Sequence, residues 1–161
     1  MTSDEWVRQR LVDRSALRER QTIISTGFDG LCRNLWAAIV AIVDSYGNCA
    51  PDETAEHSEF GPDNCWARAG QQSRESRSLM TGDPRKLELR FDSKKATVGV
   101  SYQRCPGSKS QSFSVGVNGD GQATFLGADG VPISVEDLAR LIVDPFLFPG
   151  LPAWSLEAKQ G

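Results

Sequence analysis

The sequence predicts an α+β protein of two layers, in which helices cover one face of an antiparallel sheet. Apolar residues recur every three or four positions from Phe28 to Tyr46, which is typical of a buried helix face. Between residues 85 and 126, polar and apolar residues alternate at every second position, which is typical of strands. The 161 residues are 39% hydrophobic, enough for a core without disulfide or metal staples, so we expect one domain over 1–161.

Residues 1–46 are predicted to be helical. Thr2 followed by Glu5 matches the capping box that starts many helices. The apolar stripe is strong from Phe28 onward and only partial before it. The earlier apolar residues, which are interspersed with five arginines, are Trp6, Val7, Leu11, Val12 and Leu17.

Two glycines leave the form of this helical region open. Gly27 and Gly30 interrupt the pattern, and a glycine inside a helix costs only about 1 kcal/mol. One long helix with a weak point and a helix pair broken at 25–29 are therefore both consistent with the sequence.

The next segment, 47–84, is predicted to be a long irregular polar loop. It has few apolar residues and contains Pro51, Pro62, Pro84 and four glycines. A loop of this length is uncommon inside a compact domain, so a short helix near 65–78 or a strand near Phe60 are the alternatives.

Residues 85–126 are predicted to form a four-stranded antiparallel sheet with one buried and one wet face. The turn at Asn118–Gly121 consists of residues that tolerate positive φ angles. The expected strands are 86–91, 96–103, 112–117 and 122–126. The residues expected to face the core are Leu87, Leu89, Phe91, Val98, Val100, Tyr102, Phe113, Val115, Val117 and Phe125.

A second helix is predicted over 134–144, on the same face of the sheet as the first. Ser134 is its expected cap, with Asp137 three positions later, and Pro145 is expected to end it. The tail over 145–161 is unusually apolar. It either closes the core against the first helix or forms a contact between chains.

Three residues are weak candidates for chemistry: Cys49, His57 and Cys65, each separated from the next by seven residues. Thiolates and imidazole are zinc ligands, and a cysteine beside a histidine can act as a nucleophile. Zinc loops usually contain two cysteines two to four residues apart, which this sequence lacks. We therefore expect loop residues without a shared site, and no catalytic residue, metal or cofactor.

The candidate interaction surface combines the wet face of the sheet with the apolar tail. Small polar residues leave that face smooth, and glycines there allow close approach of a partner. Its candidate residues are Arg90, Gly99, Ser101, Gln103, Ser114, Gly116, Phe146, Phe148 and Trp154.

Charge and hydropathy restrict the class of partner. Residues 44–65 contain six acidic and no basic residues, whereas 66–109 contain ten basic and four acidic residues. The net charge is −3, so we expect no nucleic-acid partner. The longest apolar run, Leu35–Val43, is short of the roughly 20 residues of a membrane span. With acidic residues at the amino terminus, we expect a cytoplasmic protein with reduced cysteines.

These observations predict a small soluble, non-catalytic protein that binds another protein or a second copy of itself. The alternative is a small-ligand-binding protein or enzyme with a pocket between the sheet and 47–84, where His57, Arg90, Tyr102 and Arg104 converge. A third hypothesis is an adaptor with the general build of a secretion chaperone, which is an analogy at the level of the fold alone.

Overall fold

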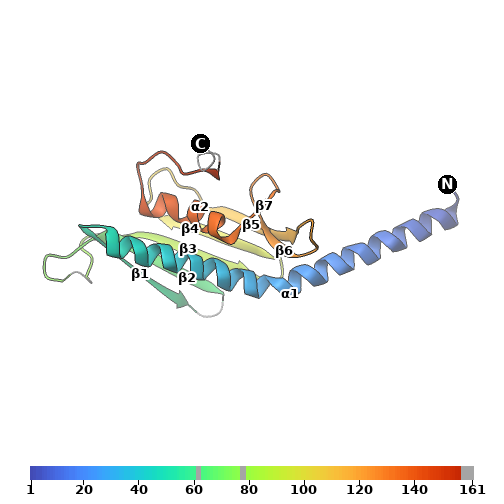
Figure 1. Ribbon diagram of the computed structural model, residues 1–161, viewed down its shortest axis with the longest axis horizontal. Coiled ribbons are helices and arrows are strands. Elements are labelled where there is room, and N and C mark those ends of the chain that lie inside the picture. Colours follow the sequence, from blue (N-terminus) through green and yellow to red (C-terminus); the bar gives the residue numbers. More distant parts are fainter. Residues whose placement is uncertain (61–62, 77–78, 157–161) are drawn as a thin grey trace.

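The computed structural model describes residues 1–60, 63–76 and 79–156, and it confirms the α+β class. Two helices lie over one face of an antiparallel sheet (Figure 1). The helices are α1 (Ser3–Cys49) and α2 (Val135–Leu147). The strands are β1 (Glu53–Phe60), β2 (Asn64–Gln71), β3 (Arg85–Asp92), β4 (Thr97–Gln103), β5 (Gln111–Val117), β6 (Ala123–Leu126) and β7 (Pro132–Ile133).

The sheet has seven strands where the sequence predicted four. They lie in chain order, each antiparallel to its neighbours, and curl into a half barrel. All of the predicted inward residues except Val117 lie in the core or pack against it, and Leu87, Leu89, Val98 and Phe125 are fully buried. The core therefore lies between the concave face of the sheet and the two helices.

The predicted irregular loop is wrong over the first part of 47–84, because α1 continues to Cys49 and β1 and β2 form a hairpin from Glu53 to Gln71. The alternative of a strand near Phe60 is confirmed by β1, and that of a short helix near 65–78 is wrong, because β2 occupies 64–71. The inward positions of β2 hold small residues, Cys65, Ala67 and Ala69, all buried. Small inward residues carry a weak hydrophobic signal, which hid the alternation from sequence analysis.

Helix α1 is continuous, so the alternative of a helix pair broken at 25–29 is wrong. A Cβ atom at Gly27 would lie 2.7 Å from the Cβ of Ala123 in β6, whereas one at Gly30 would meet nothing within 4 Å. Gly27 therefore lies where the helix backbone approaches β6 closely, and the glycine reflects packing rather than a break. The predicted capping box of Thr2 and Glu5 is confirmed.

Replacing Gly27 and Gly30 by alanine is expected to shift stability in opposite directions. Gly30→Ala removes backbone entropy at an open position and should raise the free energy of unfolding by about 0.5–1 kcal/mol. Gly27→Ala should lower it by about 1–3 kcal/mol, because the new methyl group must push α1 away from β6. Urea unfolding of both variants checks the prediction, and equal stabilisation of the two would contradict the close approach.

Helix α2 starts at the predicted cap, since the Ser134 hydroxyl accepts a hydrogen bond from the Asp137 amide. It ends later than predicted, with Pro145 inside its last turn. The helix continues because Phe146 and Leu147 gain full burial, which outweighs the one hydrogen bond that proline removes. The tail was predicted over 145–161, and its first three residues, 145–147, thus belong to α2.

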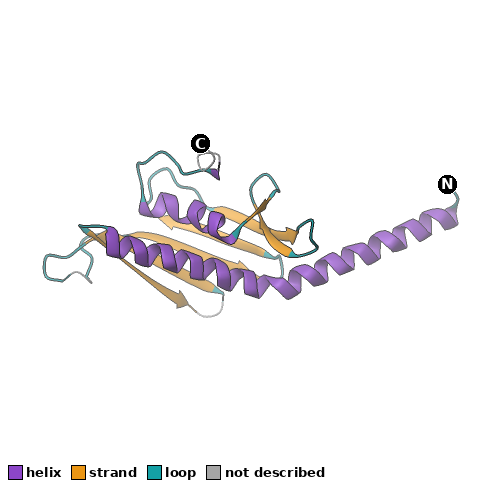
Figure 2. Cartoon of the chain, viewed as in Figure 1, coloured by secondary structure: helices purple, strands orange, loops and turns teal. Residues whose placement is uncertain are grey.

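The amino-terminal part of α1 projects away from the rest of the molecule (Figure 2). We call residues 3–22 the arm; the body comprises the remainder of α1, the sheet and α2. Every residue of the arm is exposed, and burial begins with Ile23 and Phe28. At 1.5 Å per residue the arm is about 30 Å long.

Candidate functional site

The arm carries an exposed apolar face. Trp6, Val7, Leu11 and Leu17 lie on one side of the helix together with Arg10, Asp13 and Arg14. The exposed fractions of the large apolar side chains are 57% for Trp6, 46% for Val7, 48% for Leu11, 63% for Val12 and 55% for Leu17. This face continues the spacing of three and four residues with which Ile24, Phe28 and Leu35 pack on the body. One helix stripe is therefore covered in the body and uncovered in the arm.

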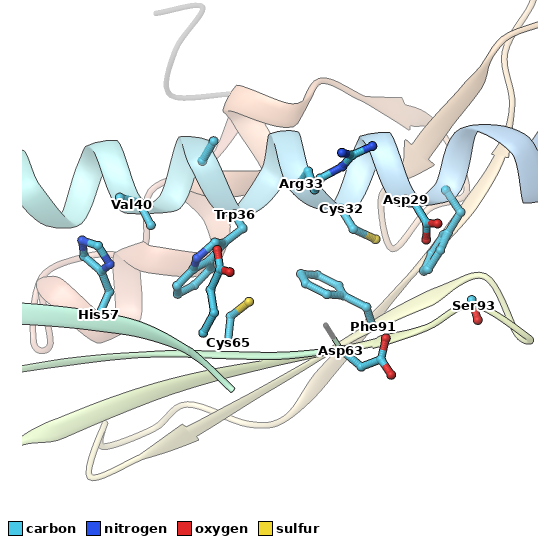
Figure 3. Close-up of a pocket in the computed structure, with 13 residues that line it drawn as sticks. Asp29, Cys32, Arg33, Trp36, Val40, His57, Asp63, Cys65, Phe91 and Ser93 are labelled. Atoms are coloured by element: carbon cyan, nitrogen blue, oxygen red, sulfur yellow. The ribbon is translucent and has the colours of Figure 1, made fainter. Parts of the chain in front are cut away.

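Beside the arm, the body has an open groove of about 1130 Å³ between α1 and the sheet. We call it the groove. Its helix wall runs from Phe28 to Val40, and its other wall is formed by β1, β2 and the β3–β4 hairpin (Figure 3). The apolar floor consists of Phe28, Cys32, Trp36, Cys65 and Phe91.

The charged side chains that line the groove are mostly acidic. Asp29, Glu59 and Asp63 outnumber the single guanidinium of Arg33 among the described lining residues, and all four are exposed. His57 Nε2 lies 3.0 Å from the Oδ1 atom of Asp44. The groove thus combines an apolar floor with a rim that favours cationic groups.

The two cysteines of the groove are not activated thiols. Burial, with smaller effects of Asp29 and Cys65, raises the pKa of Cys32 to about 12. Burial raises the pKa of Cys65 to about 11, with a smaller effect of Glu59. Nucleophilic and metal-binding cysteines need the thiolate, so at neutral pH both residues act as apolar groove residues.

The structure does not bring Cys49, His57 and Cys65 together. His57 and Cys65 line the groove, whereas exposed Cys49 lies in a separate depression beside Phe148. Within residues 1–60, 63–76 and 79–156, no three His, Cys, Asp or Glu side chains are placed to share a metal ion. His57 and Cys65 therefore belong to the groove, and Cys49 belongs to a different part of the surface.

The predicted convergence of His57, Arg90, Tyr102 and Arg104 is wrong, because only His57 lines the groove. The Tyr102 hydroxyl donates a hydrogen bond of 2.7 Å to the carbonyl of Ile142 in α2. Arg104 forms an ion pair with Asp83. Arg90 lies on the opposite face of the sheet, beside Glu88.

The predicted wet face exists, with one exception. Arg90, Ser101, Gln103 and Ser114 are exposed. Gly99 is half-buried, and a Cβ atom there would meet nothing closer than 3.9 Å. Gly116 is buried, because the side chain of Leu126 on β6 covers it. Gly116 therefore offers no surface for the close approach of a partner.

The apolar tail divides between core and surface. Phe146 is fully buried and cannot be an interaction residue as the sequence suggested. Phe148 is 42% exposed and its ring meets that of Tyr46 edge to face. Trp154 is half-buried, and its amide donates to the carboxylate of Asp144. The tail beyond residue 156 lies outside the described residues.

Sequence analysis missed the arm as a functional element, although its signal was present. Trp6, Leu11 and Leu17 belong to a partial stripe in the same predicted helical region as the strong stripe that begins at Phe28. The stripe does not show where the sheet ends, so it could not show which part of the helix stays uncovered. Helix α1 also contains a window long and apolar enough to cross a membrane, of which 33% is buried in the body. Core helices and signal sequences near an amino terminus both meet this criterion.

No protein-family model matches the sequence, and neither a curated protein nor a solved structure gives a significant match to the chain. The functional argument therefore depends on the arm and the groove themselves.

Proposed function

We propose that this protein is a non-catalytic protein-binding module whose docking element is the arm. The observation that carries the proposal is the arm's exposed apolar face, which continues the packed stripe of α1 beyond the body. Tryptophan and arginine dominate the energetics of protein interfaces, and this face presents Trp6, Arg10 and Arg14 together.

The energetics support binding by the arm. Full burial of a large apolar side chain contributes about 1.5–3 kcal/mol, so burial of Trp6, Leu11 and Leu17 would contribute several kcal/mol. An isolated helix of this length is only marginally stable in water. The arm extends from a helix already fixed by the body, which lowers the entropy cost of presenting it to a partner.

Aspartate substitution on the apolar face should abolish association through the arm. In Leu11→Asp/Leu17→Asp, a charged group enters each contact, and we expect at least a hundredfold loss of affinity. The matched control, Leu79→Asp/Val131→Asp, changes two apolar residues of the body with similar exposure, 54% and 57%, and should retain association. Light scattering after size exclusion measures the mass, and hydrogen exchange measures protection of arm amides.

The proposal fails if the arm amides exchange at unprotected rates in the isolated protein and in extracts of its source. It also fails if both double variants keep the same assembly mass and the same protection as the unaltered chain.

A second candidate is binding of a small ligand, favoured by the volume of the groove and its apolar floor. Such a ligand would contact Trp36, so its binding would change tryptophan fluorescence, and Trp36→Phe would remove that change. A secretion-chaperone-like adaptor would be one special case of the arm-based function.

A further inference from the structure

We propose that the partner of the arm is a second copy of this chain: the arm of each copy lies in the groove of the other. The inference depends on the proposed function, since it names the occupant of the same docking element. The interface would then be isologous, the arrangement of most soluble homodimers.

The dimensions of arm and groove agree. The apolar face of the arm runs from Trp6 to Leu17, a length of about 17 Å of helix. The helix wall of the groove runs from Phe28 to Val40, about 18 Å. The apolar face of one arm therefore matches one groove in length.

The continuity of α1 makes the exchange reciprocal. Arm and groove wall belong to the same helix and lie at similar distances on either side of Ile23. A two-fold axis near Ile23 sets two α1 helices antiparallel and brings each arm beside the groove wall of the other copy. Both contacts then form together, which doubles the buried surface without any change in the fold.

The charges of the two surfaces are complementary. The apolar face of the arm includes Arg10 and Arg14 with one acid, Asp13, whereas the groove presents Asp29, Glu59 and Asp63 with one guanidinium, that of Arg33, and His57, which lies against Asp44. The Arg10–Asp13 pair is exposed, 3.3 Å long and within one helix, so it competes weakly for the guanidinium. Trp6 and Leu17 would meet the apolar floor, and the arginines the acidic rim.

A charge exchange between arm and groove tests this arrangement. The arm variant is Arg10→Glu/Arg14→Glu, and the groove variant is Glu59→Lys/Asp63→Lys. All four residues are exposed, so the fold should persist, which circular dichroism and thermal unfolding confirm. Each variant alone should dimerise at least tenfold more weakly than the unaltered chain. An equimolar mixture should form heterodimers, because both of its arm–groove contacts are again complementary.

Two controls carry the same charge changes at other places. Arg8→Glu/Arg20→Glu alters the arm away from its apolar face, and Glu75→Lys/Asp120→Lys alters exposed acids outside the groove. Both should dimerise like the unaltered chain in sedimentation velocity experiments.

The outcomes separate the two proposals. In one outcome the arm variant loses association, but the groove variant still dimerises like the unaltered chain and the mixture forms no heterodimers. The arm then binds a different surface or a different protein, and only this inference is overturned. The dimer is likewise overturned if the pure protein is a monomer at every concentration while its arm amides are protected from hydrogen exchange in source extracts. The arm-based function then still stands. If the arm variant changes neither mass nor protection, the proposed function is overturned as well.

Discussion

Raising the pH from 8 to 11 is expected to lower the free energy of unfolding by about 5 kcal/mol through two buried thiols. Burial raises the pKa of Cys32 to about 12 and that of Cys65 to about 11, from an ordinary value of 9.0. Above pH 9 the unfolded chain releases these protons while the folded chain retains them. The unfolded state then binds fewer protons, so stability falls as the pH rises, by roughly 2 to 3 kcal/mol per thiol at pH 11.

The contribution of the thiols can be separated from that of other groups. Burial and the carboxylate of Glu53 raise the pKa of Tyr46 to about 12. Tyr46 therefore adds to the loss of stability above pH 10. In Cys32→Ala/Cys65→Ala, the difference in unfolding free energy between pH 8 and pH 11 should shrink by most of the thiol contribution. Cys49→Ala, at an exposed cysteine, is the control. An unchanged pH difference in the double variant would contradict the assignment.

Replacing Arg85 by methionine is expected to lower the free energy of unfolding by about 1.5 to 3 kcal/mol. Arg85 Nη2 lies 2.7 Å from Glu53 Oε1, and Arg85 Nε donates to the carbonyl of Phe146 in α2. Glu53 also accepts a hydrogen bond from the Tyr46 hydroxyl. The side chains of Arg85 and Glu53 are only 17% and 22% exposed, so the substitution leaves a largely buried carboxylate without its counterion.

A surface pair provides the control for Arg85. Arg104 pairs with Asp83, and the two side chains are 53% and 78% exposed. Arg104→Met should cost less than about 1 kcal/mol. In the double variant Arg85→Met/Glu53→Gln, the charge is removed with its partner, and part of the stability should return. If Arg85→Met and Arg104→Met are equally mild, the network of Arg85, Glu53 and Tyr46 does not hold β1, β3 and α2 together.

The parts of the fold with regular patterns could be predicted from the sequence. The strands over 85–126 alternate large apolar and polar residues, and Ser134 marks the start of α2. The β1–β2 hairpin could be predicted only as the alternative of a strand near Phe60, because the inward residues of β2 are alanines and a cysteine, which carry a weak hydrophobic signal. Gly27 was misleading because its close neighbour, Ala123, lies about a hundred positions later in the sequence.

The candidate site was harder to predict than the fold. His57 and Cys65 were noted as residues that share chemistry, and they do share a groove, but with Trp36 and Phe28 from α1 rather than with Cys49. The arm's residues were visible in the sequence, yet their exposure follows from the extent of the sheet. The exposure of a residue depends on the tertiary structure of the whole chain, so a local sequence pattern cannot show it.

The order of the strands has a consequence for how the chain folds. Each strand pairs with its neighbours in sequence, so the sheet is built from successive short-range hairpins, which favours rapid folding. The last helix is different, because α2 packs chiefly against α1 from the other end of the chain. During synthesis, the concave face of the sheet therefore stays open beside α1 until α2 emerges. This final docking step is the stage at which the nascent chain is most exposed to aggregation.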